Sequence, residues 1–138
     1  MKRFALLLVC LVILGCDQQK QPAQLKQKPG SQATQKTFLL FVKIPDPVLP
    51  LERGKKYEDP LDAFLKAKGL GEVSGGGSQL SQPNAAGQRS IEWVGVDVEV
   101  YDPDKALPFV IEKLKELGVP NGTVIEQSEP VERTIDVK

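Results

Sequence analysis

The segment SIEWVGVDVEVY (90–101) constrains the fold most, because valine occupies every second position in its second half. Strict alternation of apolar and polar residues is typical of a strand with one face in the core and the other in solvent. Ile91 and Trp93 break the alternation, and a β-bulge at Val94-Gly95 would restore it. That bulge would place Ile91 and Trp93 with the later valines on the core face. The predicted open face then carries Glu92, Asp97, Glu99 and Tyr101.

The other apolar segments of the chain follow strand and helix patterns in turn. In chain order we expect a strand at 37–44, a loop at 45–58, a helix at 59–68, a strand from 72, the strand at 90–101, a helix at 102–117, a strand at 122–127 and an edge strand at 133–137. Asp59-Pro60 and Asp102-Pro103 each predict a helix start, with an N-cap followed by proline. Pro108 should end or kink the first turn of the second helix, whose main part is expected at 108–117.

This order of elements predicts an α+β fold of the ferredoxin-like (split βαβ) type. We expect a two-layer sandwich in which two helices cover one face of a four- to five-stranded antiparallel sheet. The other face of the sheet would remain open. Residues 37–138 are expected to form a single domain, since about 100 residues can hold one modest core.

The stretch GLGEVSGGGSQL (69–80) contains five glycines, which raises the possibility of a phosphate-binding loop. A Walker loop needs a lysine directly after its last glycine, but Ser78 stands there, and a Rossmann loop needs a third glycine where Ser74 stands. No helical pattern follows to supply the helix N-terminus that binds phosphate. We predict that the run ends a strand and leads into a mobile loop at 74–89. The alternative is a glycine strand that a ligand or partner backbone approaches closely.

A basic cluster in LERGKKYE (51–58) is one candidate for partner binding. Arg53, Lys55 and Lys56 lie close together in the sequence, beside Tyr57. The arginine fork and the lysine charges would suit an anion or an acidic partner. The alternative is an ordinary solvated loop, because runs of charge are usually solvated.

An acidic group on the strand at 90–101 is the second candidate. Glu92, Asp97 and Glu99 would form a stripe of carboxylates if they share the open face. Paired carboxylates can perform acid–base chemistry or hold a hard cation such as calcium. No calcium-loop motif accompanies them, and a solvent-facing strand surface is the alternative.

The absence of histidine excludes several classes of enzyme. The chain has no histidine, and its two cysteines, Cys10 and Cys16, lie near the amino terminus. Ser-His-Asp and Cys-His mechanisms and typical zinc sites are therefore excluded. A formal net charge of zero gives no electrostatic footprint for nucleic acid. We expect no catalytic activity, no cofactor and no metal, and a carboxylate-dependent enzyme is the alternative.

The amino terminus has the pattern of a secretory signal peptide. Lys2 and Arg3 precede the apolar run FALLLVCLVIL (4–14), which is too short to span about 30 Å of hydrocarbon. The following ILGC (13–16) resembles the bacterial lipobox. This resemblance implies a signal peptide at 1–15, cleavage after Gly15, diacylglycerol on the sulfur of Cys16 and acylation of the new amino terminus.

The segment that follows the lipobox has the composition of a tether. Residues 16–36 are rich in glutamine and contain a single leucine, so they cannot bury enough apolar surface to fold. We expect the chain to be anchored to the cell membrane by lipid, with its domain on the extracytoplasmic or periplasmic side. Several acyl chains would hold it stably, whereas one would hold it only marginally.

Two longer segments, at 55–80 and 91–126, resemble a group of small bacterial proteins without an assigned activity. The resemblance implies only a shared small α/β domain. The expected function is that of an extracytoplasmic lipoprotein whose domain binds a protein partner at the cell envelope. That domain would use its open sheet face and the segments 45–58 and 74–89. An immunity-type inhibitor of a toxin or envelope enzyme is the alternative.

Overall fold

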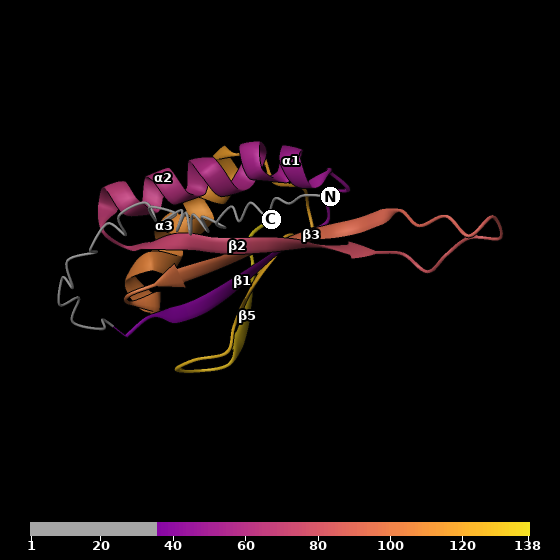
Figure 1. The fold of residues 1–138 in the computed structure, drawn as a ribbon. Helices are drawn as coiled ribbons and strands as arrows, with labels where there is room; N and C mark the ends of the chain where they lie inside the picture. Colours follow the sequence, from indigo (N-terminus) through magenta and orange to yellow (C-terminus); the bar gives the residue numbers. More distant parts are fainter. Residues whose placement is uncertain (1–35) are drawn as a thin grey trace, which may run out of the picture. The chain divides into compact units, whose positions relative to one another are not determined.

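The computed structural model describes residues 36–138, so the predicted signal peptide, Cys16 and most of the tether lie outside the described residues. Figure 1 shows a sheet with helical segments packed beside it. The strands are β1 (Phe38–Ile44), β2 (Gly71–Leu80), β3 (Ile91–Val100), β4 (Val124–Gln127) and β5 (Arg133–Asp136). The helical segments are α1 (Pro50–Arg53), the π-helical η1 (Gly54–Glu58), α2 (Asp59–Lys68) and α3 (Pro103–Glu116).

The five strands form one sheet in the order β2-β3-β1-β4-β5. All four neighbouring pairs are antiparallel. β1 lies at the centre, and β2 and β5 form the two edges. The predicted α+β fold with a five-stranded antiparallel sheet is therefore confirmed, and its helices are compatible with a two-layer sandwich.

One face of the sheet forms the core together with the helices. Val42 of β1 pairs with Val96 of β3 and with Ile125 of β4, and all three side chains are fully buried. Directly paired residues in an antiparallel sheet point to the same face. The helices contribute the buried residues Leu61 and Leu65 of α2 and Ala106, Leu107, Val110 and Leu114 of α3. The apolar stripes of both helices therefore pack against this face of the sheet.

The connection from β1 to β2 is helical from Pro50 to Lys68, so the predicted loop at 45–58 is wrong from residue 50 onward. Glu52 stabilises the start of this helix, since its Oε2 accepts a hydrogen bond of 3.2 Å from Leu49 N. Gly69 ends it with φ 63°, in the left-handed conformation that glycine adopts easily. The predicted helix at 59–68 is therefore confirmed by α2, and α1 and η1 extend the helical segment back to Pro50.

Pro60 lies inside this helix, although Asp59-Pro60 predicted a helix start. Just before it the helix widens into a π turn, in which Asp59 N donates to Gly54 O. Proline has no N–H, and its ring clashes with the carbonyl four residues back in a regular α-helix. The wider turn accommodates the ring and lets the helix continue.

The second predicted helix starts where its cap indicated. Asp102 Oδ1 accepts a hydrogen bond of 3.2 Å from Lys105 N, and α3 begins at Pro103. Pro108 does not end the first turn, because α3 continues through it to Glu116. Buried residues on both sides of the proline, Leu107 and Val110, pack on the sheet and hold the helix together.

The glycine run lies within β2, so the predicted loop at 74–89 is wrong as far as Leu80. β2 and β3 form a long hairpin that projects beyond the rest of the domain in Figure 1. The loop at its tip turns at Asn84, whose Oδ1 accepts hydrogen bonds of 2.9 Å from Ala86 N and Gln88 N. The segment is therefore a glycine-rich strand as far as Leu80.

The predicted bulge at Val94-Gly95 is also wrong. The register of β3 with β1 is continuous from Val94 to Val100, which puts all four alternating valines in the core. The irregularity lies nearer the tip, where Gln79 pairs with Trp93 and Leu80 pairs with Ile91. Trp93 consequently lies on the open face with Gly95, instead of on the core face.

Candidate binding surface on the open sheet face

The sheet face opposite the core carries a mixed apolar and acidic surface. Leu39 pairs with Glu99, Phe41 pairs with Asp97, and each pair shares this face. Leu39 is 50% exposed, and Phe41 is half-buried. We name this surface the open face and define it by Leu39, Phe41, Lys43, Trp93, Asp97, Glu99 and Glu126.

Two aromatic rings form the centre of the open face. The centroids of Phe41 and Trp93 are 6.0 Å apart, and the ring planes meet at 79°, an edge-to-face arrangement. The Phe41 ring lies over Gly95, since a Cβ on Gly95 would come within 2.5 Å of Phe41 Cε2 and Cζ. Lys43 Nζ lies 4.9 Å from the centre of the Trp93 ring, within range of a cation–π interaction. Glycine at position 95 thus provides the space that the aromatic pair needs.

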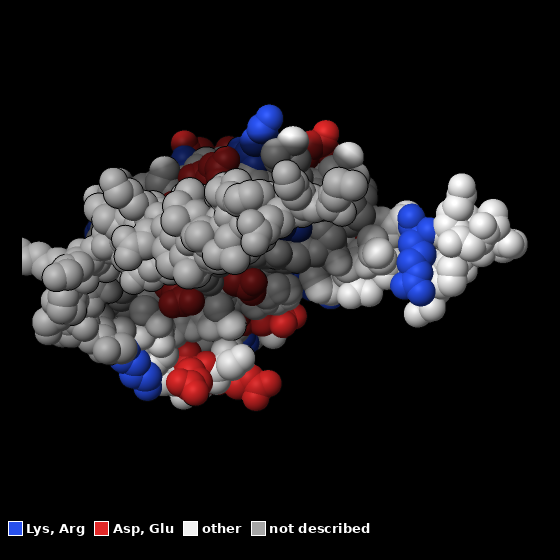
Figure 2. Space-filling model, in the orientation of Figure 1, with Lys and Arg blue, Asp and Glu red and all other residues white. Residues whose placement is uncertain are grey.

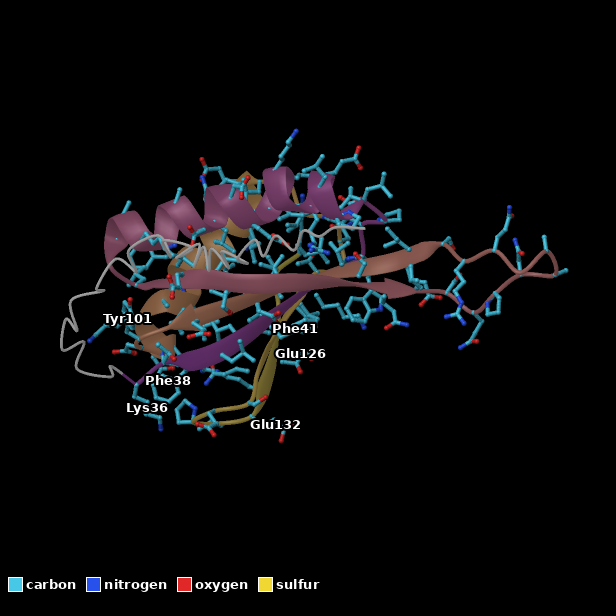
Figure 3. The ribbon with its side chains drawn as sticks, in the orientation of Figure 1. Lys36, Phe38, Phe41, Tyr101, Glu126 and Glu132 are labelled. Atoms are coloured by element: carbon cyan, nitrogen blue, oxygen red, sulfur yellow. The ribbon has the colours of Figure 1, made fainter. Side chains whose placement is uncertain are left out.

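Carboxylates flank the aromatic pair. Phe41 is paired with Asp97 on β3 and with Glu126 on β4, and Figure 3 shows Phe41 and Glu126 close together on the side of the sheet away from α2. Glu99 Oε2 accepts a hydrogen bond of 3.1 Å from Thr37 Oγ1. Figure 2 shows acidic side chains on this side of the domain and also on the helical side. The prediction that Asp97 and Glu99 share the open face is confirmed by the register.

Glu92 does not belong to the same row of carboxylates. It is the residue of β3 that has no counterpart on β2 at the irregularity between Trp93 and Ile91. Its side chain is exposed near the projecting end of the hairpin. The structure therefore brings two of the three predicted carboxylates together and adds Glu126 from the separate strand β4.

The predicted basic cluster is divided between two internal networks. Arg53 Nε donates to Glu58 Oε1 in a close ion pair, and Arg53 Nη1 donates to Ser78 Oγ at 3.0 Å. The Arg53 side chain is 11% exposed. Gly76 lies beneath this pair, where a Cβ would collide with Glu58 Oε1 and Gly95 O. Arg53 therefore joins the first helix to β2, instead of facing a ligand.

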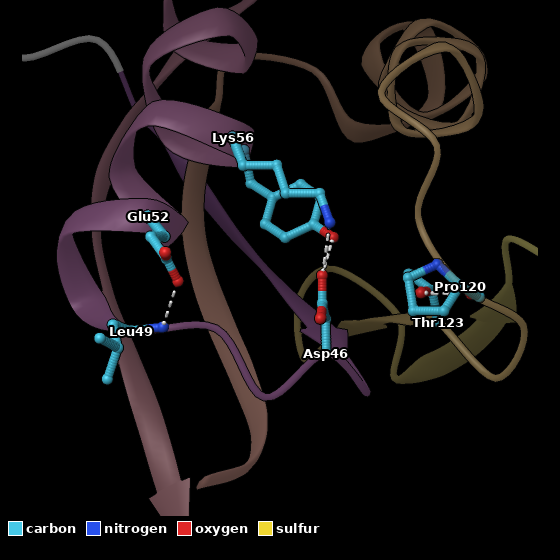
Figure 4. A network of polar contacts seen from close by, with 7 residues as sticks. Asp46, Leu49, Glu52, Lys56, Pro120 and Thr123 are labelled. Atoms are coloured by element: carbon cyan, nitrogen blue, oxygen red, sulfur yellow. Dashed lines mark hydrogen bonds and ion pairs between the residues drawn. The ribbon is translucent and has the colours of Figure 1, made fainter.

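Lys56 and Tyr57 bind the same carboxylate, that of Asp46. Lys56 Nζ donates to Asp46 Oδ2 at 2.7 Å, and Tyr57 Oη donates to the same oxygen at 2.5 Å (Figure 4). The hydrogen bond to Asp46 raises the pKa of Lys56 to about 12. Burial raises the pKa of Tyr57, and the bond to Asp46 adds to that rise. Burial alone would raise the pKa of Asp46, but the two hydrogen bonds outweigh it, so this pKa lies below its usual value.

Lys55 is the remaining member of the predicted cluster, and its side chain is exposed. Tyr57 is fully buried, so it offers no surface to a partner. The four side chains consequently do not share one exposed surface. Their spacing in the sequence did not reveal this, because the partners Asp46 and Ser78 come from separate elements.

A second acidic region lies beside the edge strand β2. A hollow of about 280 Å³ is lined by Glu58, Asp59, Asp62, Val73, Ser74 and Gly75. Asp62 Oδ1 accepts a hydrogen bond of 2.9 Å from Val73 N, and its other oxygen lies 3.0 Å from Lys66 Nζ. Within residues 36–138, no group of three or more histidine, cysteine or acidic residues is arranged to hold a metal ion.

Comparisons with protein-family models, curated proteins and solved structures find no significant match to this chain. A search of the described part of the chain for a helix long and apolar enough to cross a membrane finds none. The candidate surface is accordingly defined by geometry alone.

Proposed function

We propose that the chain is a lipid-anchored extracytoplasmic lipoprotein whose folded domain binds a protein partner on its open face. The observation that carries this proposal is the Phe41–Trp93 pair, which lies on the sheet face opposite the core. Aromatic side chains are enriched at the centres of protein interfaces, where they supply large contact area. The domain acts as a binding module in this account, and no catalytic step is assigned to it.

The charges of the open face indicate the chemistry of the partner. Asp97, Glu99 and Glu126 surround the aromatic centre, and Lys43 is the basic residue among the seven that define the surface. Complementary potentials favour association with the correct partner and disfavour others. We therefore propose a partner surface with an apolar centre and a rim of lysine or arginine.

The anchor part of the proposal rests on the amino-terminal sequence. The apolar run at 4–14 followed by ILGC at 13–16 supports processing before Cys16 and lipidation of its sulfur. Residues 17–36 would then separate the domain from the membrane. Twenty flexible residues have a root-mean-square reach of roughly 25 Å, enough for the open face to meet an envelope protein.

The strand order supports a more specific fold class. β3 lies between β1 and β2, and β1 lies between β3 and β4. The unit β1-α2-β2 therefore has β3 between its two strands, and the unit β3-α3-β4 has β1 between its two strands. We propose that this is the split βαβ arrangement, extended at the β4 side by β5.

Site-specific photo-crosslinking in a bacterial host tests the binding proposal. A photoreactive residue replaces Leu39 on the open face in one variant and the exposed Glu112 on α3 in a matched control. We expect a discrete crosslinked product from position 39 that is absent from position 112, and that is reduced by an added Trp93→Ser substitution. Equal products from both positions would contradict the assignment of the partner surface to the open face.

A further inference from the structure

The two edges of the sheet differ in how well they are protected. Exposed strand edges invite pairing with other chains, and proteins usually shorten them or place charges along them. β5 has four residues, of which Arg133 and Asp136 are charged. β2 has ten residues, and Glu72 is the one that is charged. β2 therefore presents the longer and less protected edge.

The outward-facing backbone groups of β2 follow from the ladder. Ser81 N donates to Ser90 O at 2.8 Å, so the backbone of residue 81 faces β3. Alternate residues of an antiparallel strand face alternate sides, so residues 79, 77 and 75 also face β3. The N–H and C=O groups of Gly76, Ser78 and Leu80 then face away from the sheet. Within residues 36–138, no turn or loop backbone pairs with them.

A side chain occupies the outer edge of β2 at its start, whereas the second half of that edge has no backbone partner among the described residues. Asp62 Oδ1 accepts from Val73 N, which occupies the edge just before the irregularity between Val73 and Gly75. Beyond that point Gly77 has nothing within 4 Å of the position of a Cβ, so close packing does not explain this glycine. Glycine in a strand often marks a site where another backbone approaches closely. The open edge is thus Gly76–Leu80, apart from Leu80 O, which accepts a hydrogen bond of 2.9 Å from Gln79 Nε2.

The residues around the open edge indicate the occupant. Glu58, Asp59, Asp62 and Glu72 supply four negative charges at one end, and Arg53 and Lys66, which pair with three of them, supply two positive charges. The net charge of this group is −2. The bond from Arg53 to Ser78 also holds the first helical turn against β2, and that turn exposes Leu49 and Leu51. Leu80 is exposed on the edge strand itself.

We infer that the open edge of β2 accepts an extended segment of a partner protein as a sixth strand. That segment carries lysine or arginine near the acidic hollow and apolar residues near Leu80. Main-chain hydrogen bonds would supply affinity, and alternate side chains would supply specificity. A second copy of this chain is disfavoured as the occupant, because its β2 contains no lysine or arginine to lie near the acidic hollow. The inference stands apart from the open face, since it uses none of its residues.

Amide hydrogen exchange, measured by NMR on the full chain in detergent, tests this assignment with synthetic peptides. The probe is a short peptide that alternates lysine and valine. Its controls are a peptide that alternates glutamate and valine, and the lysine peptide with methyl groups on its alternate backbone nitrogens. We expect the first peptide alone to slow exchange at Gly76, Ser78 and Leu80. Equal binding of the acidic peptide, or protection centred on β5 or the open face, would overturn the inference.

Substitutions at the edge distinguish the effect of backbone hydrogen bonding on peptide affinity from the effect of charge. Leu80→Pro removes one outward N–H, and we expect about five- to tenfold weaker binding of the lysine peptide. Leu80→Ala keeps the N–H and should retain more of the affinity. Asp59→Lys should weaken binding about threefold or more, and the loss should shrink at high salt, whereas Glu132→Lys near the opposite edge should have no effect. Unchanged affinity in both Leu80→Pro and Asp59→Lys would overturn the inference.

Two other occupants would be recognised in the same experiment, and each would overturn it. If the amides of Gly76, Ser78 and Leu80 are already protected without peptide and deprotect on dilution, a second copy occupies the edge. If they are protected at all concentrations and deprotect when residues 16–35 are deleted, the chain's own amino-terminal segment occupies it. Photo-crosslinking from position 39 reports on the open face separately, so the two proposals fail independently.

Discussion

Gly95→Ala should weaken the fold through the aromatic pair on the open face. The added methyl group would lie within 2.5 Å of Phe41 Cε2 and Cζ, so the ring must leave its position over the strand. Moving Phe41 also disturbs its edge-to-face contact with Trp93. The substitution therefore tests whether position 95 must be glycine for a packing reason.

The expected magnitude combines three effects. Overpacking a filled site costs about 1–3 kcal/mol, and loss of an aromatic pair costs about 0.5–1.5 kcal/mol. Replacing glycine by alanine within a strand returns roughly 0.5–1 kcal/mol, because glycine loses more backbone freedom on folding. We expect the free energy of unfolding to fall by about 1–3 kcal/mol.

Gly77→Ala is the matched control, because Gly77 pairs directly with Gly95 and has open space around it. It should leave stability unchanged or raise it by up to about 1 kcal/mol. Urea denaturation followed by the fluorescence of Trp93, the one tryptophan of the chain, measures both variants. Equal effects at positions 95 and 77 would refute the reasoning. So would an unchanged effect of Gly95→Ala in a Phe41→Ala background, where the clash is removed.

The polar networks make three further predictions. Asp46→Asn should lower the free energy of unfolding at neutral pH by about 1–2 kcal/mol in urea denaturation, because Lys56 loses its ion pair and Tyr57 its charged acceptor. In the wild type, the stabilisation that Asp46 provides is fully present above its unfolded-state pKa of 3.8 and is lost as pH falls through its lower folded-state pKa. The free energy of unfolding should therefore fall less steeply on acidification in Asp46→Asn than in the wild type. An identical slope in the two proteins would contradict this. The pKa of Lys56 is raised from 10.5 to about 12, so the stabilisation that it provides should be lost as pH rises through that range. The free energy of unfolding of Lys56→Met should lack this decrease at alkaline pH. Arg53→Lys should cost about 1–2 kcal/mol in the same assay, because lysine cannot bond Glu58 and Ser78 together; stability equal to the wild type would refute a joining role.

The part of the fold that was predictable from sequence depended on clear periodicity. The alternating valines identified β3, and their parity placed Asp97 and Glu99 on the open face. The first helix was missed before residue 59, because prolines and a glycine interrupt its pattern. Its stability comes from contacts with residues distant in sequence, including the bond between Arg53 and Ser78.

The aromatic centre of the open face was not predictable in the same way. β1 is apolar on both faces, so its sequence does not distinguish Phe41 from its buried neighbours Leu40 and Val42. The sequence pattern predicts Trp93 in the core, because a bulge at Val94-Gly95 would put the apolar residues Ile91 and Trp93 on the same face as the later valines. The register is decided instead by pairing with β1 and by the space above Gly95, and neither is a local property.

Membrane fractionation combined with intact mass measurement tests the central claim most directly. The wild type and Cys16→Ala are expressed in a bacterial host and compared. The account predicts that the wild type pellets with membranes and has the mass of a lipidated chain beginning at Cys16, and that the variant does neither. Soluble, full-length protein in both cases would contradict the lipid anchor and the envelope location of the partner.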